Sequence, residues 1–173
     1  MIKIKLTHKA EKLTRGSKFS TGLDLKAKGF SLIINNKIIE PIWFDESNIK
    51  SVTLKPFERV LIKTGIQFET EEPYVVENKD LILVDTTIRN RSGLTLKTGV
   101  LCNLGVIDCE FRGDIGCSMI NLSNEDYTIN ENDAVGQLCF SFAGIPVIDY
   151  VDNLSDSERG GNGFGSTEGT KNA

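Results

Sequence analysis

Short apolar stretches, broken at close intervals by glycine, asparagine and proline, run along most of this chain. Many of them alternate apolar with polar residues and are rich in β-branched side chains, as half-buried strands are. We find no stretch with the three- and four-residue apolar spacing of a sustained amphipathic helix. Strands are therefore expected at Ile2–Leu6, Leu23–Lys28, Arg59–Phe68, Leu81–Ile88, Ile115–Leu122 and Ala134–Ala143.

One hairpin is expected within this series. Between Ser31 and Glu40, two apolar runs flank the pair Asn35-Asn36. Asparagine tolerates the positive φ angles of a tight turn, so this pair favours a hairpin. Many short strands separated by turn residues are typical of an all-β fold, either a sandwich or a barrel.

The pattern changes near Asp152. Residues 155–168 are polar and rich in glycine, with Phe164 as their only aromatic residue. Such a stretch buries too little apolar area to offset the entropy lost on ordering it. We therefore expect one β-domain over residues 1–154 and a flexible C-terminal tail over residues 155–173. An isolated ring in such a tail favours a functional role over a bare terminus.

Composition narrows the classes of function. The 173 residues are 39% hydrophobic and 25% charged, with a net charge of −4 and a pI near 5.1. This composition is typical of a globular domain, and the acidic balance disfavours binding to nucleic acid or to an anionic membrane. The N-terminus does not resemble a signal peptide, and no apolar run is long enough to span a membrane. We expect a cytoplasmic protein.

The cysteines and the histidine do not suggest a metal centre. Four cysteines are present, none at the two-residue spacing of a zinc site, and His8 is the only histidine. A structural zinc site is therefore not predicted from the spacing. Buried, reduced cysteines are the expected state in a cytoplasmic protein.

Five segments carry groups that bind or react, although each has an ordinary explanation by itself. Arg91–Lys97 offers a cation, a hydroxyl and small-residue backbone amides, the material of a phosphate nest, or else a simple turn opening a short helical segment. Arg159–Thr167 is glycine-rich but lacks the Gly-Lys-Ser/Thr ending of a P-loop. The other three contain Asp24, Asp108 and Gln137, which fit equally well as surface acids and a strand polar residue.

Taken together and in this order, the five segments resemble the five motifs of trimeric dUTPases. They are Ser20–Ala27, Arg91–Lys97, Gly105–Gly113, Asp133–Leu138 and Arg159–Thr167. The resemblance implies a jelly-roll-like β-barrel, assembled as a homotrimer with active sites shared among subunits. It also implies hydrolysis of dUTP to dUMP and pyrophosphate, which lowers dUTP and supplies dUMP for thymidylate synthesis.

The resemblance also implies a role for individual residues. Asp108 would orient and activate the attacking water, and Asp24 would hold Mg²⁺ through water. Phe111 would stack under the sugar, and Phe164 would stack on uracil from a tail supplied by a third subunit. The full set of expected substrate-binding residues is Arg91, Ser92, Gly93, Asn103, Val106, Phe111, Gln137, Arg159, Phe164, Gly165, Ser166 and Thr167.

This chain departs from the family pattern at several positions. Phe111 stands where tyrosine is usual, and Ala134 replaces an arginine, so that a charge is missing or is supplied by Arg89 or Arg112. Asn103 lies one residue closer to Asp108 than usual, which implies a shorter uracil-reading hairpin. Residues 29–55 and 71–85 are longer than a minimal dUTPase needs. The first would add a hairpin that is either an extra packed edge or a surface for a protein partner.

Two rival functions follow from the same residues. A dCTP deaminase would need a glutamate ten residues after Asp108, where this chain has Ser118. A regulatory protein on the same scaffold would bind nucleotide or a partner, with incidental catalysis. The segment 29–55 and the altered fourth motif favour the regulatory alternative, whereas Asp24, Asp108 and the complete tail motif favour turnover.

Overall fold

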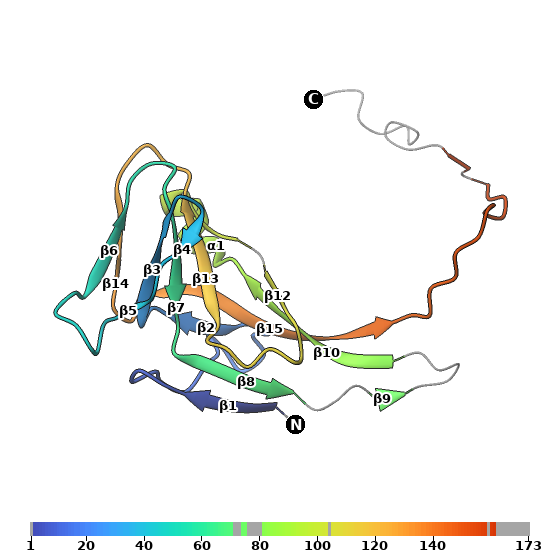
Figure 1. Ribbon diagram of the computed structural model, residues 1–173, viewed down its shortest axis with the longest axis horizontal. Helices are drawn as coiled ribbons and strands as arrows, with labels where there is room; N and C mark the ends of the chain where they lie inside the picture. The colour runs from blue at the N-terminus through green and yellow to red at the C-terminus, as the bar shows by residue number, and fades with distance from the viewer. Residues whose placement is uncertain (1, 71–73, 76–80, 104, 159, 162–173) are drawn as a thin grey trace.

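The structure of the protein is a computed structural model that describes residues 2–70, 74–75, 81–103, 105–158 and 160–161 (Figure 1). These residues form fifteen β-strands and one short helix, α1 (Ser92–Thr98). The strands are β1 (Ile2–Leu6), β2 (Leu23–Lys26), β3 (Gly29–Ile34), β4 (Lys37–Ile38), β5 (Ile42–Trp43), β6 (Ser51–Leu54), β7 (Arg59–Lys63), β8 (Ile66–Thr70), β9 (Tyr74–Val75), β10 (Leu81–Arg89), β11 (Val100–Cys102), β12 (Gly105–Ile107), β13 (Gly116–Asn121), β14 (Tyr127–Asn130) and β15 (Ala134–Ile145).

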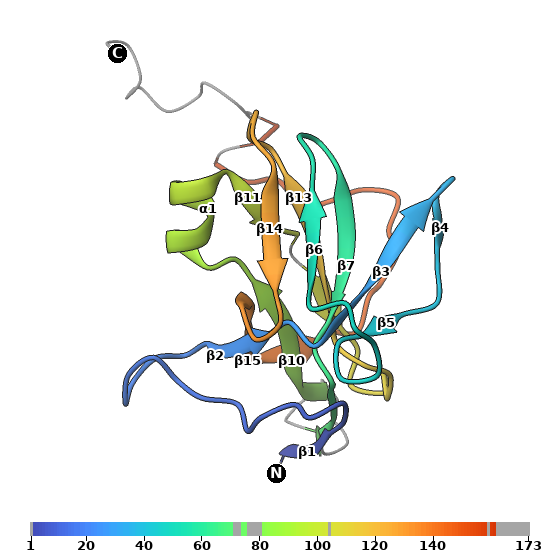
Figure 2. The same cartoon turned by 90° about the vertical axis from the view of Figure 1, so that its left-hand side faces the viewer.

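Two larger sheets make up the body of the molecule. One has the order β11-β13-β7-β3-β4 with β5 beside β3, and the other has the order β12-β10-β15-β2 with β9 beside β10. Figure 2 shows the first sheet upright, with β2, β15 and β10 crossing beneath it. Two further pairs, β1-β8 and β14-β6, complete the fold. The all-β expectation is confirmed, although the described strands form four separate sheets and do not close into one barrel.

The core lies between these sheets because alternate residues of each strand point inward. In β13 every second residue is buried, and β7 and β8 show the same alternation. Leu25, Ile62, Met119 and Leu138 are almost completely enclosed. Phe44 is also fully buried, so the segment 29–55 contributes to the core as well as to the surface.

The predicted strand Arg59–Phe68 was wrong as a single element. It is interrupted after β7, where Gly65 adopts a φ of +69°. A side chain at this position would place its Cβ only 2.5 Å from the carbonyl oxygen of Thr7. The left-handed turn redirects the chain, so that β8 leaves the sheet of β7 and pairs with β1.

The predicted hairpin is confirmed. β3 pairs with β4 in antiparallel register, and the turn residues Asn35 and Asn36 have φ angles of 50° and 60°. Both central residues therefore have the left-handed conformation of the turn that suits a two-residue hairpin. The hairpin tip is also fastened by Arg59, whose Nη2 donates to Asn36 Oδ1 at 2.9 Å.

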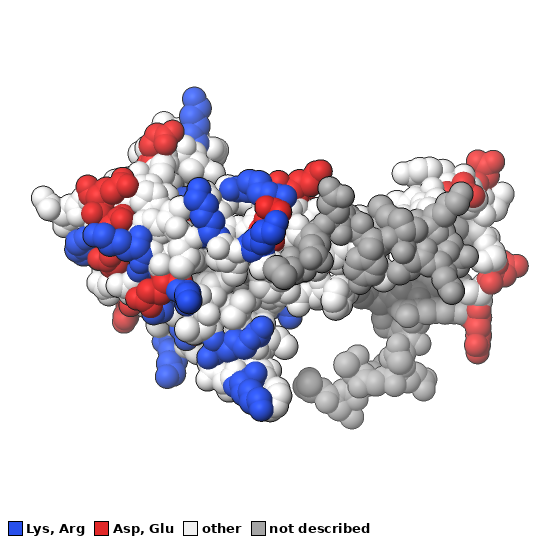
Figure 3. Space-filling view, turned by 90° about the horizontal axis from the view of Figure 1, so that it is seen from below, with Lys and Arg blue, Asp and Glu red and all other residues white. Residues whose placement is uncertain are grey.

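The second sheet extends beyond the body as a ribbon. β10 and β15 remain paired from Arg89–Gln137 to Leu81–Ile145, and the described chain then continues away from the domain (Figure 1). On the face in Figure 3, basic and acidic side chains are interspersed over the body. None of the described helical segments is long and apolar enough to cross a membrane.

Candidate active site

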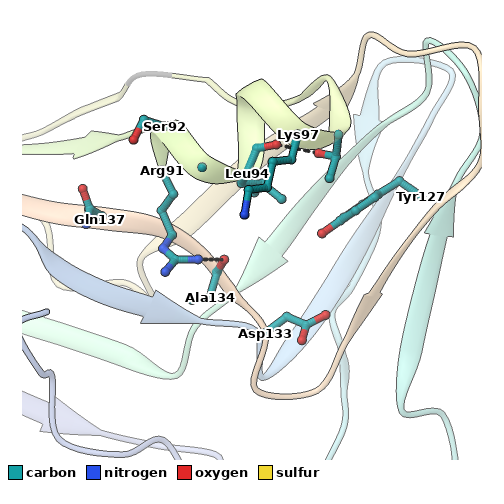
Figure 4. A pocket seen from close by; sticks show the side chains of 10 residues that line it. Arg91, Ser92, Leu94, Lys97, Tyr127, Asp133, Ala134 and Gln137 are labelled. Carbon is teal, nitrogen blue, oxygen red and sulfur yellow. Dashed lines mark hydrogen bonds between the residues drawn. The ribbon is translucent and has the colours of Figure 1, made fainter.

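A cavity of about 520 Å³ opens between α1 and the start of β15 (Figure 4). It is lined by Arg91, Ser92, Gly93, Leu94, Lys97, Thr98, Tyr127, Asp133, Ala134 and Gln137. Three of the expected substrate-binding residues come from one short stretch because α1 begins at Ser92, directly after Arg91. The helix ends at Thr98 and is capped by Gly99, whose φ of 70° suits a glycine.

Arg91 is held in place by contacts from two strands. Its Nη1 donates to the carbonyl oxygen of Ala134 at 3.2 Å, and its Nε lies 3.3 Å from Asp24 Oδ1. Gln137 is paired with Asp24 in the β15–β2 register and donates from Nε2 to the same carboxylate oxygen at 3.4 Å. Arg91, Asp24 and Gln137 therefore form one contact network at the edge of the cavity.

The space beside Gln137 depends on a glycine. A Cβ at Gly22 would lie 3.0 Å from both Cβ and Cδ of Gln137. Contacts this short occur rarely, so a larger residue would push the amide away from Asp24. The glycine in the segment Ser20–Ala27 therefore keeps the network closed.

Lys97 is a cavity residue that the sequence analysis missed. Figure 4 shows its side chain and that of Arg91 pointing into the same space. Leu94, Lys97 and Thr98 all line the cavity, and their i, i+3, i+4 spacing on α1 is the signal that could have identified Lys97. Arg89 and Arg112, which we considered as replacements for the missing arginine at position 134, do not line this cavity.

Tyr127 and Asp133 lie across the cavity from the basic residues (Figure 4). Burial, together with the carboxylate of Asp133, raises the pKa of Tyr127, and Arg91 partly opposes this effect. The phenol therefore stays protonated at neutral pH and can donate a hydrogen bond. A cavity with two cations, an amide and a phenol offers donors suited to an anion.

Asp108 belongs to a second cavity of about 230 Å³. It follows β12, and the chain then turns so that the Phe111 amide donates to the Asp108 carbonyl oxygen at 3.0 Å. Phe111 is 43% exposed as a residue, and its ring covers Gly113, where an added Cβ would lie 2.5 Å from the ring atom Cζ. The lining residues are Ile88, Gly105, Val106, Ile107, Asp108, Phe111, Asp114, Ile115 and Gly116.

Val106 lines the Asp108 cavity, whereas Asn103 lines neither that cavity nor the Arg91 cavity. Asn103 is exposed, and its backbone amide donates to the carbonyl oxygen of Ser118 at 2.7 Å. Val106 is exposed on β12 and lines both the Asp108 cavity and its neighbour. The predicted tail residues Arg159, Phe164, Gly165, Ser166 and Thr167 lie outside the described residues.

Within the described part of the chain, the expected site residues other than Asn103 thus fall into two groups. Arg91, Ser92, Gly93 and Gln137 share a cavity beside Asp24, whereas Val106, Asp108 and Phe111 share another. The two cavities have no lining residue in common. One group offers donors for an anion, and the other offers an exposed carboxylate beside an aromatic ring.

Comparison with known proteins gives a consistent set of relatives. The model of the dUTPase family matches residues 33–168. The deoxyuridine 5'-triphosphate nucleotidohydrolase of Nautilia profundicola is 42% identical over 130 residues, covering 74% of this chain and 84% of that protein. The corresponding protein of Fusobacterium nucleatum is 39% identical over 126 residues, covering 70% of this chain and 78% of that protein.

A solved structure shows the same fold. The dUTPase of Staphylococcus bacteriophage 80alpha with dUpNHpp matches with a TM-score of 0.70 at 21% identity. The match covers 96% of this chain and 98% of the phage protein. At this identity the comparison supports the fold alone, whereas the bacterial relatives and the family model establish descent.

Proposed function

This chain belongs to the dUTPase family, and we propose that it hydrolyses dUTP to dUMP and pyrophosphate. The observation that carries the proposal is the cavity in which Arg91, Lys97 and Gln137 converge beside Asp24. A triphosphate is strongly anionic, and fixed cationic donors stabilise the charge that develops on its oxygens during hydrolysis. In the cell this reaction would lower dUTP and supply dUMP for thymidylate synthesis.

We assign the chemical step to Asp108. Its exposed carboxylate would accept a proton from a water molecule while the water oxygen attacks the α-phosphorus. The bond from the α-phosphorus to the oxygen that bridges it to the β-phosphorus breaks. The donors around Arg91 would stabilise the negative charge of the pyrophosphate that leaves. Phe111 would support the deoxyribose, and Asn103 and Val106 would line the path of the uracil ring.

Magnesium suits the arrangement around Asp24. The Asp24 side chain is 23% exposed and offers a hard carboxylate oxygen at the edge of the Arg91 cavity. Mg²⁺ retains most of its water and takes only one or two protein carboxylates in nucleotide sites, so a water-bridged ion fits. When bound, the ion would neutralise the charge of the phosphate oxygens and orient the triphosphate.

We propose that each active site is assembled from copies of the chain in a homotrimer. The separation of Arg91 and Asp108 into two cavities supports this proposal, because one complete site needs both. Exposed apolar side chains at the end of β15 and beyond it also support association; they include Phe142, Val147, Ile148, Tyr150 and Leu154. The tail carrying Arg159 and Phe164 would come from a third copy and cover the nucleotide.

Protein binding through residues 29–55 is a second candidate function. Ile34 and Ile38 are more than half exposed at the tip of the β3–β4 hairpin, which a purely structural edge does not require. A pull-down with the intact chain and with a chain shortened at the hairpin tip tests this function. Binding that survives the shortening would exclude the hairpin as the partner surface.

A cytoplasmic location agrees with the cysteines. Cys102, Cys109, Cys117 and Cys139 are all free thiols, which is the usual state in a reducing compartment. We therefore retain the cytoplasm as the proposed location of the enzyme.

The proposed reaction is tested by product analysis with Mg²⁺. The full chain is assayed with dUTP, dCTP, dTTP and UTP, and dUMP, pyrophosphate and ammonia are all measured. We expect pyrophosphate release from dUTP, and a loss of about 10²–10⁴-fold in Asp108→Asn with retained binding of a dUTP analogue. Glu110→Gln is the matched control because it removes an exposed charge from the same turn. Ammonia release from dCTP, or nucleotide binding without turnover, would contradict the proposal.

A further inference from the structure

Three side chains with metal-binding atoms meet outside the active-site cavities. Nδ1 of His8 lies 3.4 Å from Asp45 Oδ1 and 3.2 Å from Glu46 Oε1. One ligand atom from each residue can be chosen so that all three lie within 4.8 Å of one another. None of these residues lines the cavity of Arg91 or that of Asp108.

Two segments far apart in the sequence bring these residues together. His8 lies in the turn after β1, where it has a φ of 47° and the Ala10 amide donates to the Thr7 carbonyl oxygen at 2.9 Å. Asp45 and Glu46 follow β5, next to the fully buried Phe44. The cluster therefore joins the N-terminal strand to the segment 29–55.

The imidazole of His8 is held in one orientation by an aromatic stack. Its ring lies parallel to that of Trp43, with centroids 3.5 Å apart and an interplanar angle of 4°. Trp43 is itself held by the pairing of β5 with β3, where its indole lies against Gly29: a Cβ added at Gly29 would be 3.1 Å from the ring atom Cε3. A fixed ring directs Nδ1 towards the two carboxylates.

The carboxylate of Asp45 lacks the partner that its burial requires. The side chain is only 13% exposed, and within the described part of the chain Oδ1 is enclosed without a hydrogen-bond donor. His8 Nδ1 is close to this oxygen but does not form a hydrogen bond with it. A buried carboxylate oxygen is stabilised by a donor or a cation, so the position calls for one.

The distances match the edge of a metal coordination polyhedron. Zinc binds imidazole nitrogen and carboxylate oxygen at about 2.0–2.2 Å, which sets tetrahedral ligand atoms about 3.3–3.6 Å apart. The separations from His8 Nδ1 to Asp45 and Glu46, 3.4 and 3.2 Å, are of this size. These two separations are those of ligands that share a cation, and the carboxylate atoms of the cluster also lie within 4.8 Å of each other.

We propose that His8, Asp45 and Glu46 bind one divalent cation of the zinc type, with water completing the coordination. One imidazole nitrogen with two carboxylate oxygens suits zinc and its neighbours, whereas magnesium prefers oxygen ligands alone. The cation would fasten the segment 29–55 to the N-terminal strand. Cysteine and histidine spacing could not reveal this site because its carboxylates lie far along the chain from its histidine.

Trp43 supplies the test because it is the only tryptophan and stacks on His8. The full chain, freed of metal with a chelator, is titrated with Co²⁺ at neutral pH in excess Mg²⁺. We expect saturable quenching of Trp43 fluorescence at one Co²⁺ per chain, reversed by Zn²⁺. His8→Gln and Asp45→Asn should each bind at least tenfold more weakly, since even an outer partner of a metal ligand contributes about 10–100-fold. Glu40→Gln, which alters an exposed acid of the same segment, should bind as the unaltered chain does.

Absence of saturable quenching up to about 1 mM Co²⁺, the weak end of protein cation sites, would overturn the proposal. Equal affinity in Asp45→Asn and the unaltered chain would also overturn it. In that case His8 would serve only as an ion-pair partner of the two carboxylates. Asp45→Asn preserves the shape of the side chain, so it tests the metal site even if His8→Gln folds poorly. Hydrolysis of dUTP with Mg²⁺ checks whether each variant is folded.

Discussion

Nε of Arg91 lies 3.3 Å from Oδ1 of Asp24, and this contact joins the loop before α1 to strand β2. Both side chains are partly exposed, so the pair adds little to stability. The contact matters for position: it places Arg91, proposed to bind the phosphates, next to Asp24, proposed to bind magnesium. Gln137 shares the same carboxylate oxygen and completes the arrangement.

Asp24→Asn is expected to weaken the dependence on magnesium without unfolding the chain. The amide keeps the size of the side chain but lacks the charge that holds a water-coordinated cation. The Mg²⁺ concentration for half-maximal hydrolysis of dUTP should rise by about 10–100-fold, as it does when a group outside the metal's inner shell is lost. Initial rates across a Mg²⁺ titration measure this. Glu11→Gln is the control, because it removes an exposed acid that pairs with Lys26 of β2. If Asp24→Asn and the unaltered chain gave the same Mg²⁺ titration, Asp24 would have no part in binding the metal.

Gly113→Ala is expected to loosen discrimination between dUTP and UTP. The new methyl group would meet Phe111 Cζ at 2.5 Å and Cε2 at 2.9 Å, so the ring must move. In its present position we expect the ring to support the deoxyribose closely and to leave no room for a 2′-hydroxyl. We expect the ratio of kcat/KM for dUTP to that for UTP to fall by roughly tenfold, within the range of a steric pocket contact. Gly16→Ala is the control because its nearest neighbour lies at 3.8 Å. An unchanged ratio would separate Phe111 from sugar recognition.

Asp114 is expected to make stability depend on pH. Burial raises the pKa of its carboxyl above the ordinary value of 3.8, although Lys63 and the Thr64 amide, both 3.2 Å away, oppose the shift. The folded chain therefore holds this proton more tightly than the unfolded chain, so the contribution to stability is present at low pH and is lost as pH rises through the folded pKa.

Urea unfolding of the unaltered chain and Asp114→Asn, at fixed protein concentration and several pH values, tests this sign. We compare the free energy of unfolding of the unaltered chain with that of the variant. The difference, unaltered chain minus variant, should increase as pH falls from neutral towards 4, close to the ordinary pKa of an aspartic acid. A difference that decreases over this range would show that Lys63 outweighs burial.

Much of the fold could be predicted from local patterns. β13 alternates along its whole length, β15 is a long and largely apolar run, and Asn35-Asn36 identifies the hairpin turn. Six of the strands of two to four residues, β5, β6, β9, β11, β12 and β14, were missed because so few residues cannot establish a period. Their positions depend on pairing with distant partners. The break at Gly65 was missed for the same reason, since its conformation is set by contact with Thr7.

The candidate site was predicted residue by residue from the five motifs, but its spatial grouping was not. Lys97 was not predicted as a site residue, although its helical spacing from Leu94 is consistent with its place in the Arg91 cavity. Asp108 lies in a separate cavity because it follows β12, which is at the edge of its sheet. The order of residues along the chain does not reveal this separation. Spacing along the chain likewise gave no sign that His8 would meet Asp45.

We propose that Arg91 and Asp108 of one active site come from different copies of the chain. A chain carrying Arg91→Ala and a chain carrying Asp108→Asn should each be nearly inactive as homotrimers. When equal amounts are unfolded and refolded together, random assembly in a closed ring of three should restore about a quarter of the sites. We therefore predict dUTP hydrolysis at about a quarter of the rate of unaltered chains refolded in the same way. Activity no greater than that of the two separate variants, with mixed trimers verified by mass, would contradict the shared site.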